Sequence, residues 1–166
     1  MAKSKKIAKA DSKPYLAAAF YCEKIVEDKE HVFSCIRIVD TLTIELDEST
    51  PSEFPSKEHP ISVQTHALIS FKKGRSRRRF YNLQIEIEFP SGKTKTIHNQ
   101  RIEFSKKPLG GVNLVLNTTL MVTKSGSFLL NVKLDGELIT KMPLRIISTT
   151  KYRTTGKLTV EMVAAI

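Results

Sequence analysis

The residues best suited to chemistry lie in one short segment, residues 72–79, which carries cations at six of its eight positions and no acid. These cations are Lys72, Lys73, Arg75, Arg77, Arg78 and Arg79. Guanidinium groups hold phosphates as planar forks and ammonium groups act as point charges, so the segment suits contact with a polyanion. Like charges also repel one another, which keeps such a loop solvated unless it meets an anionic partner.

Aromatic residues flank this basic segment, and one of them is a candidate platform for a nucleobase. Residue-by-residue alternation directs Phe71 and Tyr81 toward a core, which leaves Phe80 as the exposed ring. The sequence therefore predicts a nucleic-acid or other polyanion site made of the six cations and Phe80. Two alternatives stay open: a mobile hairpin tip that only keeps the protein soluble, and a surface that docks on an acidic protein.

The positive charge of the chain is confined to two places. The sequence has 27 Lys and Arg against 17 Asp and Glu, a net charge of +10. Residues 1–9 contain four lysines and no acid: Lys3, Lys5, Lys6 and Lys9. Together with the basic segment these lysines equal the whole excess, so the rest of the chain is neutral and the lysine-rich tail is a second candidate contact for a polyanion.

Other residue types give no catalytic, cofactor or metal site. The histidines are scattered and lack the spacing of metal ligands: His31, His59, His66 and His98. Glu86 and Glu88 lie two apart and fit a polar strand face better than a glycosidase pair, since the chain has no Trp to hold a sugar. Ser125-Gly126-Ser127 is no nucleophile elbow, and Gly110-Gly111 is too short to cradle a phosphate. We expect no enzyme, no cofactor and no small-molecule substrate.

A period-two hydrophobic pattern predicts the elements that position the basic segment. In one stretch the alternate residues Tyr81, Leu83, Ile85, Ile87 and Phe89 are apolar and those between them are polar. Successive side chains of a strand point to opposite faces, so this pattern gives the strand one buried and one solvated face. At least four more stretches share the pattern, which predicts an all-β fold: an antiparallel β-sandwich of the immunoglobulin-like kind with about eight or nine strands.

The first half of the chain contains one ambiguous segment. Residues 15–26 have alanines that suit a helix and aromatics that suit a strand; we favour a strand, because the polar turn Asp28–His31 leads directly into an Ile- and Val-rich stretch, residues 33–46. Asp40 interrupts that second strand and predicts a bulge or bend.

Three signals mark the second half. The apolar face switches between Ile97 and Ile102, which predicts an irregularity. Asp135-Gly136 is a two-residue hairpin signal. Pro143, inside the returning strand of residues 138–147, indicates an edge position.

Length and composition predict one domain with two terminal extensions. We expect a flexible basic tail over residues 1–13, the sandwich over 14–149, and an extension over 150–166 whose period-two apolar residues suggest a final strand. No apolar run is long enough for a membrane helix and no signal peptide is evident, so the expected compartment is the cytoplasm. Pairing Glu27 with Val32 would make the two cysteines, Cys22 and Cys35, diagonal neighbours, and we expect free, mostly buried thiols.

Two groups of motifs resemble a bacterial family of small immunoglobulin-like β-sandwich domains of unknown function. The first is Phe20-Tyr21-Cys22-Glu23-Lys24 running into Ser34-Cys35-Ile36-Arg37-Ile38-Val39-Asp40. The second runs from Ser125-Gly126-Ser127-Phe128 through Leu134-Asp135-Gly136 to Met142-Pro143-Leu144, with Phe128 where Tyr is more usual. The resemblance covers most of residues 14–149 and implies the fold and a bacterial origin, but no activity or cofactor.

Together these patterns predict a non-enzymatic binding or adaptor module that engages a macromolecule, most simply a protein, through a sheet edge or loop tips. The alternative is nucleic-acid binding by the basic segment and the lysine-rich tail. No membrane contact is expected.

Overall fold

The structure, a computed structural model, describes residues 13–47, 49–50, 55–105 and 110–151. These residues form nine strands and no helix. The strands are β1 Tyr15–Glu27, β2 Phe33–Val39, β3 Thr41–Asp47, β4 Ile61–Lys72, β5 Phe80–Glu88, β6 Thr94–Glu103, β7 Gly111–Val122, β8 Gly126–Leu134 and β9 Glu137–Lys151. The ambiguous first segment is thus a strand, as predicted. Residues 1–12 of the predicted tail (1–13) and residues 152–166 of the predicted extension (150–166), with its suggested final strand, lie outside the described residues.

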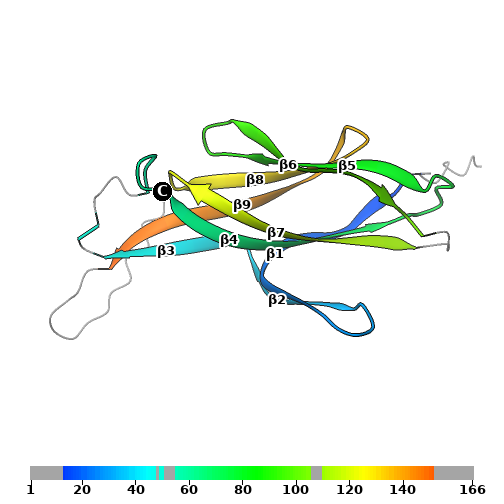
Figure 1. Ribbon diagram of the computed structural model, residues 1–166, viewed down its shortest axis with the longest axis horizontal. Coiled ribbons are helices and arrows are strands. Elements are labelled where there is room, and N and C mark those ends of the chain that lie inside the picture. The colour runs from blue at the N-terminus through cyan, green and yellow to red at the C-terminus, as the bar shows by residue number, and fades with distance from the viewer. Residues whose placement is uncertain (1–12, 48, 51–54, 106–109, 152–166) are drawn as a thin grey trace, which may run out of the picture.

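The strands form two stacked sheets (Figure 1). Sheet I has the order β2-β1-β4-β7, and sheet II has the order β3-β9-β8-β5-β6. The order β1-β4-β7 opposite β9-β8-β5-β6 corresponds to strands A-B-E opposite G-F-C-C′ of immunoglobulin sandwiches. The predicted all-β sandwich of immunoglobulin-like type is confirmed.

The alternating residues meet between the sheets and form one core. The largest fully buried side chains are Phe71, Phe104, Phe128, Ile69, Leu83, Ile85, Leu144, Ile146, Val122 and Val132. They come from both sheets, as a sandwich requires, because each sheet alone would leave one apolar face in water. Tyr81 packs edge-to-face on Phe104 with ring centroids 5.5 Å apart.

Local signals are confirmed at two positions. The ladder between β5 and β6 shifts register next to Ile97, which accounts for the switch of apolar face in this segment. Asp135 and Gly136 form the turn between β8 and β9, both with positive φ (50° and 83°), as a type I′ hairpin requires.

Two predicted strands are placed differently from expectation. Residues 33–46 are two strands, since the chain leaves sheet I at Asp40 and continues as β3 in sheet II. There β3 runs parallel to β9, whereas the other paired strands of the described residues are antiparallel. The predicted edge strand with Pro143 is wrong for β9 as a whole, because β9 lies between β3 and β8. Its ladder with β3 begins only at Arg145, so at Pro143 the paired neighbour is β8 alone.

Candidate functional site

The basic segment crosses from one sheet to the other. Lys72 is the last residue of β4 in sheet I, and Phe80 is the first of β5 in sheet II. The predicted hairpin is therefore wrong, because β4 and β5 lie in different layers and do not pair. Backbone bonds hold both ends of the crossing: Lys73 N donates to Gly110 O at 2.8 Å, and Phe104 N donates to Arg79 O at 2.8 Å.

A buried serine fixes the middle of the crossing. Ser76 is 8% exposed, and its Oγ lies 2.7 Å from the Tyr81 hydroxyl. The same Oγ accepts a hydrogen bond from Arg78 N at 3.2 Å. Gly74 supplies the left-handed turn before it, with φ of 62°. The segment is therefore tied to the sandwich at several points along its length.

Three of the six predicted cations are engaged within the protein. Lys73 is 7% exposed and its Nζ donates to Ser105 O at 3.4 Å. Arg79 pairs with Glu103 of β6. Arg78 pairs with Asp135 at 2.6 Å and places its guanidinium 4.5 Å from the centroid of Tyr81. These three cations therefore stabilise the fold at this end of the sandwich. A run of charged residues in a sequence does not show which of them have partners within the protein.

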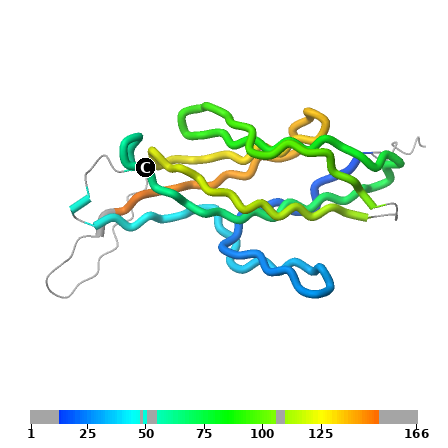
Figure 2. The backbone as a smooth tube through the Cα atoms, viewed as in Figure 1, coloured from blue at the N-terminus to red at the C-terminus, as the bar shows by residue number. Residues whose placement is uncertain are grey.

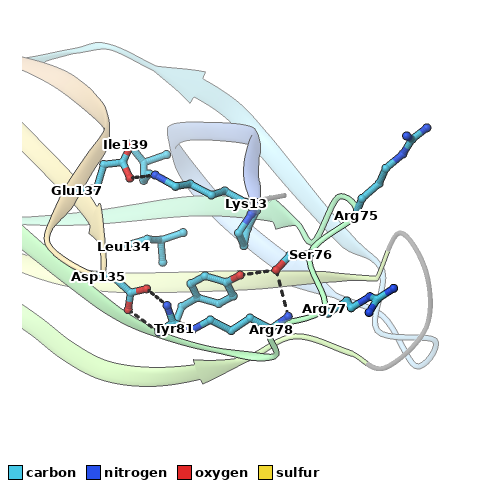
Figure 3. Close-up of a pocket in the computed structure, with 11 residues that line it drawn as sticks. Lys13, Arg75, Ser76, Arg77, Arg78, Tyr81, Leu134, Asp135, Glu137 and Ile139 are labelled. Carbon is cyan, nitrogen blue, oxygen red and sulfur yellow. Dashed lines mark hydrogen bonds and ion pairs between the residues drawn. The ribbon is translucent and has the colours of Figure 1, made fainter. Parts of the chain in front are cut away.

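Two of the predicted cations point into solvent. Arg75 and Arg77 are exposed and have no hydrogen bond or ion pair with the described residues. Figure 3 shows both side chains extending away from the hollow that the segment borders. Lys72 is partly buried at the end of β4, opposite Gly111 of β7.

Phe80 lies on the outer face of sheet II, as the alternation predicts, but its ring is already covered by arginines. The Arg101 guanidinium lies 4.1 Å from its centroid and the Arg79 guanidinium 5.4 Å. Sequence reasoning missed Arg101. The alternation of β6 puts it on the outer face, yet only the pairing of β6 with β5, in which Arg101 faces Asn82, brings it to Phe80.

A hollow of ≈ 710 Å³ lies between the basic segment and the β8–β9 turn (Figure 3). Apolar side chains of Tyr81, Leu134 and Ile139 line it, and the cations stand at its border. Its carboxylates are paired: Asp135 with Arg78, and Glu137 with Lys13 at 2.6 Å. The border of the hollow is therefore positive, because the acids there are neutralised.

The remaining titratable candidates hold structural positions. Glu86 pairs with Lys133 at 2.7 Å, and Glu88 lies 3.7 Å from Lys141, so both belong to a charged ladder across sheet II. His66 lies 2.6 Å from the Asn117 side chain. Within the described residues no three His, Cys, Asp or Glu side chains gather as metal ligands would. No helix there is long and apolar enough to cross a bilayer.

The cysteines are free and belong to the β1–β2 pair. The predicted register is off by one, since Glu27 pairs with Phe33, which sets Cys22 opposite Ile38 and Cys35 opposite Ile25. Burial, with a further contribution from the neighbouring Cys35, raises the pKa of the Cys22 thiol to about 11. Burial also raises the pKa of Tyr21, whose hydroxyl has no hydrogen-bond partner among the described groups.

A second candidate surface is the outer half of the β1–β2 hairpin, here called the ribbon (residues 23–37). β1 pairs with β4 only as far as Cys22, so beyond that residue the two strands pair with each other alone. Figures 1 and 2 show the ribbon standing out from the sandwich, on the side of sheet I that faces away from sheet II. Arg37 at its base has a left-handed φ of 48° and pairs with Glu23 at 3.2 Å. A bend of this kind turns an edge strand out of the sheet.

The ribbon and its base expose apolar side chains in an unusual concentration. Eight large hydrophobic residues of the described chain are exposed, and four of them lie here: Val26, Val32, Ile36 and Ile38. Ile38 is 65% exposed and Ile36 is 49% exposed. A groove of ≈ 490 Å³ separates the ribbon from the outer face of sheet I, lined by residues that include Ile36, His66 and Val115. Sequence alternation could not show this surface, because it assigns apolar residues to a core.

Comparison with known proteins finds similarity to solved structures only. No protein-family model and no curated protein matches the sequence. A solved structure of an alkylpurine DNA glycosylase, AlkC, of Pseudomonas fluorescens, bound to DNA with an abasic-site analogue, is similar over 81% of this chain with a TM-score of 0.45 and 6% identity. This chain spans only 30% of that protein. An immunoglobulin-like protein of Pseudomonas aeruginosa is similar over 84% of this chain and 98% of its own, with a TM-score of 0.36 and 9% identity. At TM-scores below 0.5 neither likeness carries a functional argument; the class, an immunoglobulin-like β-sandwich, follows from the strand order.

Proposed function

We propose that this protein is a non-enzymatic adaptor whose ribbon binds an extended segment of a partner protein by strand addition to β2. The observation that carries the proposal is the exposure of Ile36 and Ile38 on an edge strand, at the base of the ribbon where it leaves sheet I. An isolated two-stranded ribbon is marginally stable in water, and an exposed apolar edge invites pairing with another chain. Such an edge is retained most readily where a partner covers it.

The arrangement of the ribbon supports strand addition in particular. Within the described chain β2 pairs with β1 on one side only, so its other backbone edge is unpaired. Ile36 and Ile38 lie opposite Lys24 and Cys22 in the ladder with β1, and both are exposed. An added strand that carries apolar residues would lie beside both isoleucines while its backbone pairs with β2. Acidic and basic residues are mixed along the ribbon, so the recognition is apolar and backbone-directed rather than electrostatic.

We also propose that the chain belongs to the bacterial family whose motifs it resembles. The Phe20–Lys24 motif lies in β1, and the Ser34–Asp40 motif covers most of β2 and the bend after it. In this proposal the first of the two motif groups builds the ribbon and its base.

Site-specific photo-crosslinking in the producing cell tests the adaptor function. A photoreactive residue replaces Ile36 or Ile38, and in the control it replaces Met121, which is similarly exposed but lies on β7 at the opposite edge of sheet I. We expect an adduct with one partner protein from positions 36 and 38 and none from position 121. An adduct of twice the monomer mass would show self-association instead and would contradict the proposal, as would equal crosslinking from all three positions or none from any.

A further inference from the structure

The basic end of the sandwich, here defined as the basic segment together with Arg101, carries three arginines that no described carboxylate neutralises. Arg75, Arg77 and Arg101 have no carboxylate partner among the described residues. The carboxylates at this end are already engaged by other cations, in the pairs Arg78–Asp135, Arg79–Glu103 and Lys13–Glu137. An anion arriving here therefore meets positive charge and displaces no existing ion pair from these three side chains.

Two aromatic rings at the start of β5 each have an arginine guanidinium over the ring. Arg78 lies 4.5 Å from the centroid of Tyr81, on the inner side of the strand, and Arg101 lies 4.1 Å from the centroid of Phe80, on the outer side. Arg78 lines both the ≈ 710 Å³ hollow and a smaller one of ≈ 410 Å³ that Phe80, Asn82 and Arg101 line. The two hollows and the free arginines are thus contiguous.

A guanidinium that lies over an aromatic ring has a second face on which another planar group can stack. Nucleobases stack on arginine planes and on aromatic rings, and a sequence-tolerant site needs little more than such a platform beside a positive track. Arg101 on Phe80 is a platform of this kind, and Arg75 and Arg77 are the adjoining track. Bases are available for stacking in single strands and are hidden in a duplex, so the platform favours a single strand.

We propose that the basic end binds single-stranded nucleic acid, with phosphates on Arg75 and Arg77 and a base stacked on the Arg101 plane over Phe80. The paired cations Arg78 and Arg79 hold the loop and the rings in place. The site uses no residue of the ribbon and does not depend on the adaptor function.

Fluorescence anisotropy with labelled oligothymidylate and oligouridylate, measured as a function of salt, tests this site. For single strands the log–log salt slope is about −0.7 for each phosphate contacted, so Arg75→Ser with Arg77→Ser should make the slope shallower by about 1.4. Arg101→Lys keeps the charge and removes the plane, and should weaken binding about tenfold with an unchanged slope. The matched control is Lys93→Ser with Lys95→Ser, which removes the same charge from two exposed positions at the other end of β6 and should leave the slope unchanged.

Three results would overturn the proposal. The first is no binding of either oligonucleotide at low salt. The second is an equal change of slope in the lysine control, which would mean unspecific attraction by net charge. The third is tighter binding of a duplex than of either single strand, with an affinity that Arg101→Lys does not change. That result would show phosphate contact without stacking. Thermal denaturation of each variant accompanies the titrations. Because the Arg75 and Arg77 side chains make no hydrogen bond or ion pair with the described residues, their replacement should leave the melting temperature unchanged.

Discussion

Asp135 is expected to be the residue on which the geometry of the basic end depends most. Its Oδ1 accepts hydrogen bonds from Asn82 N at 3.0 Å and from Arg78 Nη2 at 3.1 Å, and its carboxylate pairs with Arg78. Its own N donates to Asn82 O at 2.8 Å. Since φ is 50° here, the position also requires a residue that tolerates the left-handed region. One side chain thus joins the β8–β9 turn to the start of β5.

The cost of Asp135→Ala follows from these contacts. The ion pair is partly exposed, with 57% and 30% of the two side chains accessible, so it contributes at most about 1 kcal/mol. The lost acceptor for Asn82 N costs about 1 kcal/mol and the left-handed backbone about 1 kcal/mol more for alanine. The sum is about 2–3 kcal/mol, or roughly 5–10 °C in melting temperature. Asp135→Asn keeps an acceptor and tolerates the backbone, so it should cost below about 1 kcal/mol.

Urea denaturation at neutral pH measures these differences. The control is Arg78→Ser, which removes the ion pair and the guanidinium over Tyr81 but keeps the Asp135 acceptor for Asn82 N. The expected order of destabilisation is Asp135→Ala first, then Asp135→Asn and Arg78→Ser close together. Equal losses for the alanine and asparagine variants would refute the role assigned to the acceptor and the backbone. A loss for Asp135→Ala below about 0.5 kcal/mol would refute the joining role altogether.

Three further predictions concern Tyr21, Cys22 and Gly111. Tyr21→Phe removes a buried hydroxyl without a partner among the described groups, so the free energy of unfolding at pH 7 should be unchanged or higher by up to about 1 kcal/mol. Because the pKa of Tyr21 is raised in the folded state, the natural protein loses stability as pH rises above 10, and the variant should lose less. A clear loss of stability at pH 7 in urea denaturation would contradict this. The Cys22 thiol is 2% exposed and has a pKa raised to about 11, so it should react with a thiolate-selective reagent only on unfolding. Labelling is measured in Cys35→Ser, where rapid reaction at pH 8 would be evidence against the burial of Cys22. Gly111→Ala should destabilise, because a Cβ there would lie 2.6 Å from the Phe71 carbonyl oxygen, and a melting temperature equal to that of the natural protein would disprove the close approach.

The sequence allowed the layers of the fold to be predicted, because they follow from local alternation. The buried faces of β5 and β8 were readable residue by residue, and so was the irregularity at Ile97. Which sheet a strand joins is not local. The stretch around Asp40 has one alternating pattern on both sides, yet the chain changes layer there, since β2 pairs with β1 and β3 pairs with β9.

The candidate site could be predicted only in part, for a related reason. A run of cations in the sequence does not say which ones find a carboxylate. The partners of Arg78 and Arg79 are Asp135 and Glu103, on the β8–β9 turn and on β6, and those strands meet the basic segment only in the folded sandwich. The same long-range pairing brings Arg101 to Phe80. The exposure of Ile36 and Ile38 was not predicted, because an apolar residue in an alternating strand is ordinarily a core residue.

The open edge of β2 is the feature on which the proposed function depends most, and residue-resolved amide hydrogen exchange on the purified monomer tests that edge directly. The amides of Phe33–Val39 that face β1 are hydrogen-bonded, and those that face outward are not paired with any described strand. We predict that protection alternates along β2, with every second amide exchanging at nearly the rate of an unstructured chain, while the central strands β4 and β8 remain protected throughout. Uniform protection along β2 in the monomer would mean that another part of the chain covers this edge, and it would contradict the proposal that β2 receives a partner strand.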